Sequence, residues 1–164
     1  GLPPVVVGLT VYLLLSRAGP FGVLDLLYTP TAMIIAQTVL VAPIIAALTR
    51  QVIADLNHEY DEQLRVFGVT RLGAARTLIW DARFSLLTAL LAGFGRAIAE
   101  VGAVLIVGGN INHLTRVMTT AIALETSKGN LALALGLGIV LVALSLAINA
   151  LVMGVRLRAE RIAA

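Results

Sequence analysis

Long apolar runs alternate with polar segments along this chain. The apolar runs cover residues 2–16, 29–49, 84–107 and 131–155. A helix that spans a membrane needs about 20 apolar residues, because each residue adds about 1.5 Å and the hydrocarbon layer is about 30 Å thick. The run 2–16 is shorter than this, and the other three are long enough. The pattern predicts an all-α transmembrane bundle of four spans.

The polar segment 55–83 separates the second and third runs and carries much of the charge. A charged segment between two membrane-length runs cannot lie in hydrocarbon, so we expect it to be exposed on one face of the bilayer. Within it, Glu59–Phe67 and Thr70–Ile79 have the spacing of two short helices with a shared apolar side. Gly68 predicts a left-handed or close-approach position between them, and Thr70 is the predicted cap.

Such a polar unit has two interpretations when it is considered by itself. It can be a solvated loop that lies on its own bundle, or an element that docks into a partner. Helices of this amphipathic kind, parallel to a membrane, are more often of the first type. The spacing alone therefore favours a solvated loop.

Composition agrees with a membrane protein. Hydrophobic residues make up 59% of the 164 residues and charged residues 13%, against about 25% charged residues in soluble domains. The sequence has no cysteine, which excludes disulfides and cysteine metal sites within it. The net charge of +3 and the pI near 10.0 do not predict nucleic-acid binding, because no basic run is interleaved with aromatic residues.

The arginines indicate orientation in the membrane. Those that flank or lie within the polar segment are Arg50, Arg65, Arg71, Arg76 and Arg83, and the tail carries Arg156, Arg158 and Arg161. The other loops hold only Arg17, Arg116 and Lys128. The positive-inside rule places the polar segment and the C-terminus in the cytoplasm, in a multi-pass protein of the cell membrane surrounded by lipid.

The polar segment resembles the cytoplasmic loop of ABC-importer permeases. The signature of that loop is Glu-Ala-Ala, three residues, Gly, nine residues, Ile, one residue, Leu-Pro. Glu62 and Gly68 match it, and Leu78 stands for the isoleucine. Gln63-Leu64 replace Ala-Ala, and Trp80-Asp81 replace Leu-Pro.

Other stretches are similar to the molybdate and tungstate branch of the same family. They are LPPVVVGL at Leu2, YTPTAMIIAQTVLVAPI at Tyr28 and GFGRAIAEVGAVLIVGGN at Gly93, and TRVMTTAIALETSKGNLALAL from Thr115 is most similar to tungstate permeases. The resemblance covers essentially the whole chain. It implies a single permease domain over residues 1–164 with a type I (MetI-like) core. In family terms the four spans are the last four of six, so we expect a fragment that lacks about two N-terminal helices.

The resemblance also implies partners. The permease would form a homodimer, dock its coupling loop into a cytoplasmic ABC ATPase, and receive tungstate or molybdate from an extracytoplasmic substrate-binding protein. The coupling-loop residues that it implies are Glu59, Asp61, Glu62, Leu64, Arg65, Phe67, Gly68, Thr70 and Arg71. The chain has no G-x-x-x-x-G-K-[ST] stretch for phosphate binding, so we expect it to be no enzyme, to bind no cofactor, and to rely on ATP held by the partner subunit.

Two charged residues, Arg96 and Glu100, lie within the third apolar run. Each would be costly unpaired in the membrane, but four residues apart they can neutralise each other. They either form an ion pair that fixes helix packing or line the path of the anion, where a guanidinium would attract an oxyanion transiently.

Polar residues between the third and fourth runs, in a loop over 108–116 and a predicted short helix over 117–128, are candidates for an outer vestibule. They are Asn110, Thr119 and Thr120, and the alternative for the two threonines is bonding back to their own helix. His58 and His113 lie in opposite loops, so no metal site is predicted.

Alternative functions remain at this stage. The same machine could carry another anion, such as sulfate, and a non-transporting scaffold or a channel would leave the polar segment without an ATPase. A membrane enzyme is disfavoured, because no cluster of His, Asp or Glu shares one membrane layer.

Overall fold

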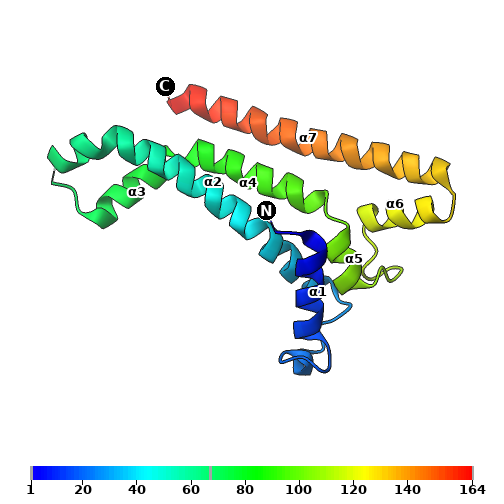
Figure 1. Cartoon of the computed structure of the whole chain (residues 1–164). Helices are drawn as coiled ribbons and strands as arrows, with labels where there is room; N and C mark the ends of the chain where they lie inside the picture. The colour runs from blue at the N-terminus through cyan, green and yellow to red at the C-terminus, as the bar shows by residue number, and fades with distance from the viewer. Residues whose placement is uncertain (1, 67, 164) are drawn as a thin grey trace.

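The computed structural model describes residues 2–66 and 68–163, and within these ranges all regular elements are helices (Figure 1). The α-helices are α1 (Pro4–Leu15), α2 (Pro30–Val66), α3 (Arg71–Asp81), α4 (Arg83–Ile98), α5 (Gly102–Gly108), α6 (Met118–Ser127) and α7 (Leu131–Ala163), with one short 3-10 helix, η1 (Gly22–Leu24).

Helix α2 is a single helix of 37 residues with Pro43 inside it. It begins at Pro30, and the hydroxyl oxygen of Thr29 accepts the Ala32 N–H at 3.4 Å. The prediction of a separate helix over Glu59–Phe67 was wrong, because these residues up to Val66 continue α2, and Phe67 lies outside the described residues. Strong helix formers fill the last turns, and no glycine or proline interrupts them.

The connection after α2 has the predicted local geometry. Gly68 has a φ of +63°, which is the left-handed conformation that favours glycine. The hydroxyl oxygen of Thr70 accepts the Gly73 N–H at 3.3 Å and caps α3, so both local predictions are confirmed. Helices α3 and α4 then meet at the buried residue Ala82 with a bend of 69°.

The third apolar run, 84–107, is not one helix as predicted. Helix α4 ends at Ile98 and α5 begins at Gly102. At the break, the Glu100 backbone N–H donates to the Ala97 carbonyl at 3.2 Å, and the Glu100 carboxylate accepts the Ala103 N–H at 3.0 Å. The charged residue therefore sits between two helices and satisfies a backbone donor of the second one.

Two described helices are long and apolar enough to cross a membrane, through Pro30–Tyr60 of α2 and Leu131–Val155 of α7. The helices α3 and α4 pass the same test only when they are taken together, and they are bent by 69° at their junction, whereas α1 has only 12 residues. At about 1.5 Å per residue α2 is about 56 Å long, so about 25 Å of it extends beyond a hydrocarbon layer.

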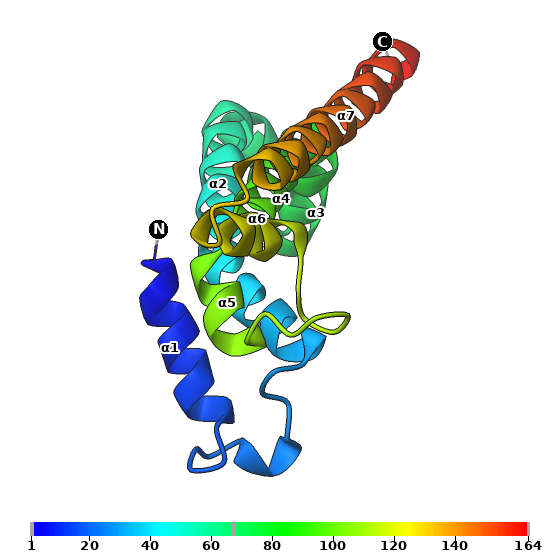
Figure 2. The same cartoon turned by 90° about the vertical axis from the view of Figure 1, so that its right-hand side faces the viewer.

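The main core lies where α1, α2 and α5 meet (Figure 2). Its buried residues are Val7, Val11, Leu15, Ala32, Met33, Ala36, Leu40, Ala103, Val104 and Val107. Gly8 lets α1 approach α5 closely, since a Cβ on it would lie 2.7 Å from the Ala103 Cα. Small residues therefore set the distance between these helices.

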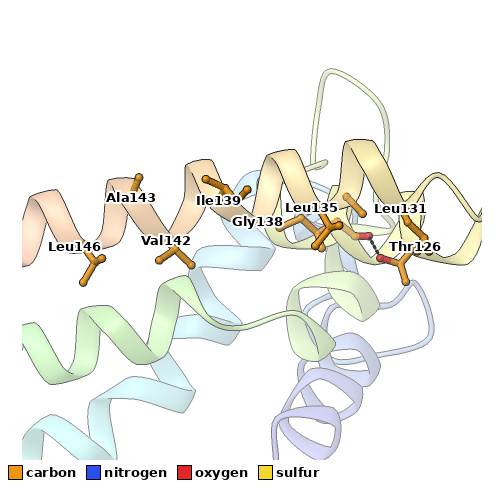
Figure 3. A pocket seen from close by; sticks show the side chains of 10 residues that line it. Thr126, Leu131, Leu135, Gly138, Ile139, Val142, Ala143 and Leu146 are labelled. Atoms are coloured by element: carbon orange, nitrogen blue, oxygen red, sulfur yellow. Dashed lines mark hydrogen bonds between the residues drawn. The ribbon is translucent and has the colours of Figure 1, made fainter.

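Helix α7 lies on the outside of the bundle, against α6 and along α4, and its C-terminus is at the same end of the molecule as α3 (Figure 1). An apolar groove of about 720 Å³ runs beside it, lined by Leu135, Ile139 and Val142 among others (Figure 3). The small residues Gly136 and Gly138 of α7 have no atom of the described chain within 4 Å of an added Cβ. They are therefore available for close approach from outside this chain.

Candidate functional site

The predicted coupling residues lie at one tip of the molecule. Glu59, Asp61, Glu62, Leu64 and Arg65 belong to the last turns of α2, Gly68 and Thr70 form the connection, and Arg71 begins α3. Glu59, Glu62, Gly68 and Thr70 are exposed, while Phe67 is outside the described residues. The structure brings this set together as one projecting helix end and the turn that follows it.

Apolar side chains at this tip are exposed. Val66 and Leu72 are 83% and 84% exposed, although they flank a polar turn. The opposite side of α3 is packed, because Leu78 and Ala82 are buried. Large apolar side chains on an extramembrane tip are typical of a surface that contacts another protein.

Arg96 and Glu100 form an ion pair at the junction of α4 and α5. The Arg96 Nη1 donates to the Glu100 Oε2 at 2.7 Å, and the other carboxylate oxygen accepts the Ala103 N–H at 3.0 Å. The Glu100 side chain is 4% exposed and the Arg96 side chain 33%. The hydroxyl of Thr119 in α6 donates to the Glu100 carbonyl at 3.2 Å. Glu100 therefore connects α4, α5 and α6.

The polar contact between α2 and α4 was missed by the sequence reasoning. The Gln37 Nε2 donates to the Ala97 carbonyl at 3.2 Å. Ala97 lies in the last turn of α4, between Arg96 and Glu100 in the sequence. Nearby, an added Cβ at Gly93 would lie 2.6 Å from Ile45 and 2.8 Å from Val41, so glycine allows α4 to pack directly on α2. The signal for this contact was the lone amide of Gln37 in an apolar run.

The predicted outer-vestibule residues have mostly internal contacts. Thr119 and Thr120 are buried, and the Thr120 hydroxyl donates to the Val117 carbonyl at 3.0 Å and accepts the Val117 N–H at 3.1 Å. Asn110 is half-buried with a φ of +51°, and its Oδ1 accepts from the Arg116 Nε at 3.4 Å. The Thr120 hydroxyl therefore holds the start of α6 and the Thr119 hydroxyl bonds to the Glu100 carbonyl, while a place in an outer vestibule stays a prediction for all three residues.

The loop between α5 and α6 depends on a residue that the sequence did not single out. Thr115 is 1% exposed, and its hydroxyl donates to the Gly108 carbonyl at 2.5 Å and accepts the Ile111 N–H at 2.9 Å. At the other end of α6, a hydrogen bond from Lys128 lowers the pKa of the Glu125 carboxyl. Both ends of α6 are thus held by local polar contacts.

Residues 1–161 match the family described as binding-protein-dependent transport system inner membrane component. This chain belongs to that permease family. The permease is 45% identical over 163 residues to a probable anion ABC transporter permease protein of Haloferax volcanii, covering 96% of this chain and 69% of the relative. It is 44% identical over 155 residues to the tungstate uptake system permease protein of Peptoclostridium acidaminophilum, covering 94% and 68%.

A more distant relative is the sulfate transport system permease protein of Salmonella typhimurium, which is 31% identical over 131 residues, covering 74% of the permease and 46% of the relative. No solved structure matches the permease. The predicted family and the predicted fold class, an all-α transmembrane permease of the MetI-like type, are confirmed. As an inner-membrane permease it belongs to a family of transport components and not of enzymes.

Proposed function

We propose that this permease is the membrane-spanning subunit of an ATP-driven tungstate importer. The observation that carries the proposal is the similarity to two tungstate uptake permeases, at 44% identity over 94% of the chain and 42% over 79%. Relatives named for sulfate transport have lower identities of 31% and 27%. Molybdate, which is also a tetrahedral oxyanion, is the second substrate to test, and sulfate the third.

The proposed partners are a cytoplasmic ABC ATPase, an extracytoplasmic substrate-binding protein and a second copy of the permease. The exposed Val66 and Leu72 at the tip support docking of the ATPase there. The open faces of Gly136 and Gly138 on α7 support a helix contact from outside this chain. The arginines at the tip and in the tail support a cytoplasmic position for both. ATP belongs to the ATPase subunit in this proposal.

Movement of the ATPase reaches the membrane through two rigid connections. Helix α2 runs without interruption from the tip into its apolar part, and α3 is joined to α4 by the single buried residue Ala82. The Gln37 amide and the contact at Gly93 hold α4 against α2, so displacement of the tip moves the two helices together. Alternating access then follows from a rigid-body shift that ends at the α4–α5 junction.

The first role that we propose for the Arg96–Glu100 pair is to hold this junction. Glu100 accepts hydrogen bonds from Arg96 and from the α5 backbone, so it keeps α5 attached to α4 when α4 moves. The second role is attraction of the passing oxyanion by Arg96, which is supported by its one-third exposure. Tight and selective binding belongs to the substrate-binding protein, because a tight site in the pathway would slow release.

The substrate proposal is tested by uptake into vesicles that contain the permease, its ATPase and its binding protein. We expect ATP-dependent accumulation of tungstate, competition by excess molybdate, and weaker competition by sulfate. Calorimetry of the binding protein with the same three anions gives the order of affinities. Uptake of sulfate with no effect of tungstate would refute the substrate, and uptake without ATP would refute the importer class.

The coupling proposal is tested with Gly68→Val. Because valine at a φ of +63° costs about 1–2 kcal/mol or forces the turn to rearrange, it should misplace the tip and abolish transport-linked ATPase activity. Gly129→Val is a matched control, since Gly129 has a φ of +80°, also has no atom within 4 Å, and lies between α6 and α7. Equal loss of coupling in both variants would show that strain alone is responsible and would refute the docking role.

A further inference from the structure

An open groove of about 1080 Å³ lies where α3 bends into α4. Two arginines, Arg76 and Arg83, line it together with Trp80, and the leucines Leu86, Leu87 and Leu90 line it along α4. Among the residues that the structure describes, no acidic side chain lines it. The groove therefore combines positive charge with an apolar trough.

The two arginines are free to bind an anion. Arg76 is exposed and has no hydrogen bond or ion pair with any described residue. The Arg83 guanidinium donates from Nη1 to the Trp80 carbonyl at 2.8 Å and stacks 4.9 Å from the Trp80 ring and 4.5 Å from the Phe84 ring. These contacts hold the guanidinium in place and leave its other N–H groups without an acceptor in the described part of the chain.

The order of these residues along the bend fits the layers of a bilayer edge. Trp80 is 68% exposed at the end of α3, where an aromatic ring suits the head-group layer. The leucines follow after the bend, on the helix that continues into the apolar part of the chain. The positive charges thus lie at the level of lipid head groups, and the trough lies at the level of acyl chains.

We propose that the groove binds one anionic phospholipid, with its phosphate between Arg76 and Arg83 and an acyl chain along Leu86, Leu87 and Leu90. Charge complementarity selects this occupant, because a zwitterionic lipid would bring a cationic group toward two unpaired guanidiniums. A free phosphate ion would leave the trough uncovered. The site is independent of the anion that the permease transports, since it needs only the bend and the membrane.

Trp80 is the natural reporter, because it is the only tryptophan in the sequence and lies in the groove. The full chain is reconstituted in phosphatidylcholine vesicles. One sample is titrated with brominated phosphatidylglycerol and the other with brominated phosphatidylcholine, and both lipids carry bromine near the head-group end of their acyl chains. Bromine quenches tryptophan on contact, and Trp80→Phe supplies the blank. We expect phosphatidylglycerol to be preferred, by a factor of about five for each arginine that faces the phosphate.

The variants Arg76→Gln and Arg83→Gln should each lower the preference about fivefold, and the double variant should abolish it. Arg50→Gln is the control, because Arg50 is an exposed arginine that does not line the groove, and it should leave the preference unchanged. Arg76→Gln disturbs no contact in the described chain, so it remains informative even if the Arg83 variant fails to fold.

Several results would overturn this assignment. Equal quenching by the two brominated lipids would show that no anionic head group is selected. An unchanged preference in the Arg76→Gln variant would exclude that arginine from the site. Inorganic phosphate is added at constant ionic strength. If it removes the preference for phosphatidylglycerol, the ligand of the arginines is a free anion. Loss of all lipid quenching when the ATPase subunit is added would make the groove a protein interface.

Discussion

The substitution Glu100→Gln tests whether one residue holds the α4–α5 junction. It removes the charge but keeps an oxygen for the Ala103 N–H, which now lies 3.0 Å from the carboxylate. The loss is therefore confined to the 2.7 Å ion pair with Arg96. In the membrane-embedded protein, this change leaves the guanidinium without its partner.

The expected cost follows from burial. Breaking a fully buried ion pair by removing one partner costs about 3–5 kcal/mol. About a third of the Arg96 side chain is not covered by this chain, so we expect Glu100→Gln to lower the free energy of unfolding by about 2 kcal/mol, as for a hydrogen bond to a charged group. Arg96→Gln should cost more, about 3–4 kcal/mol, because it strands a carboxylate that is only 4% exposed.

The assay is a double-mutant cycle. The free energy of unfolding is measured in mixed detergent micelles for the two single variants and for Arg96→Gln combined with Glu100→Gln. Because the double variant strands no charge, its cost should be smaller than the sum of the single costs by at least about 1 kcal/mol. Tungstate uptake per folded transporter should stay within about twofold of the wild type in the double variant.

Two results would contradict this reasoning. Costs that add within about 0.5 kcal/mol would mean that the two side chains do not interact in the folded protein. A double variant of restored stability that no longer transports would show that the charge of Arg96 acts on the anion and not on the junction.

Three further substitutions test the packing and the caps. Gly8→Ala should lower stability by about 1–3 kcal/mol, because its Cβ meets the Ala103 backbone at 2.7 Å, while Gly136→Ala, with open space and a helical backbone, should be neutral or stabilising in the same thermal-unfolding measurement. Thr70→Ala should cost about 1 kcal/mol through loss of the α3 cap, seen as faster amide exchange in α3, and Thr70→Ser should not. Thr115→Val should cost about 1–3 kcal/mol in unfolding free energy because the buried Gly108 carbonyl loses its donor and the Ile111 N–H loses its acceptor, and an unchanged value would place water in that loop.

Much of the fold followed from features that are local in the sequence. The start of α2 at Pro30, the cap at Thr70 and the left-handed Gly68 depend on residues within one turn, so short-range physics predicts them. The apolar runs likewise predicted the two long spans, because length and hydropathy need no tertiary information.

The sequence did not predict helix ends and contacts that depend on which of several hydrogen-bond or packing partners a residue finds in the fold. The run 84–107 is apolar enough for one helix, but the Glu100 carboxylate competes for the backbone N–H of Ala103, and the helix ends there. The contacts of Gln37 with Ala97 and of Gly8 with Ala103 join residues far apart in the chain. No periodicity within a single run encodes such pairs.

Pro43 removes one backbone hydrogen bond from the apolar part of α2. It is the one interior proline of this 37-residue helix, and it lacks the N–H that would bond four residues back. From there to Val66 the helix forms a stiff arm of about 35 Å at 1.5 Å per residue. A bend of only about 5° at Pro43 would swing the tip by about 3 Å, so a small change of backbone angle in the apolar part of α2 corresponds to a large displacement at the tip.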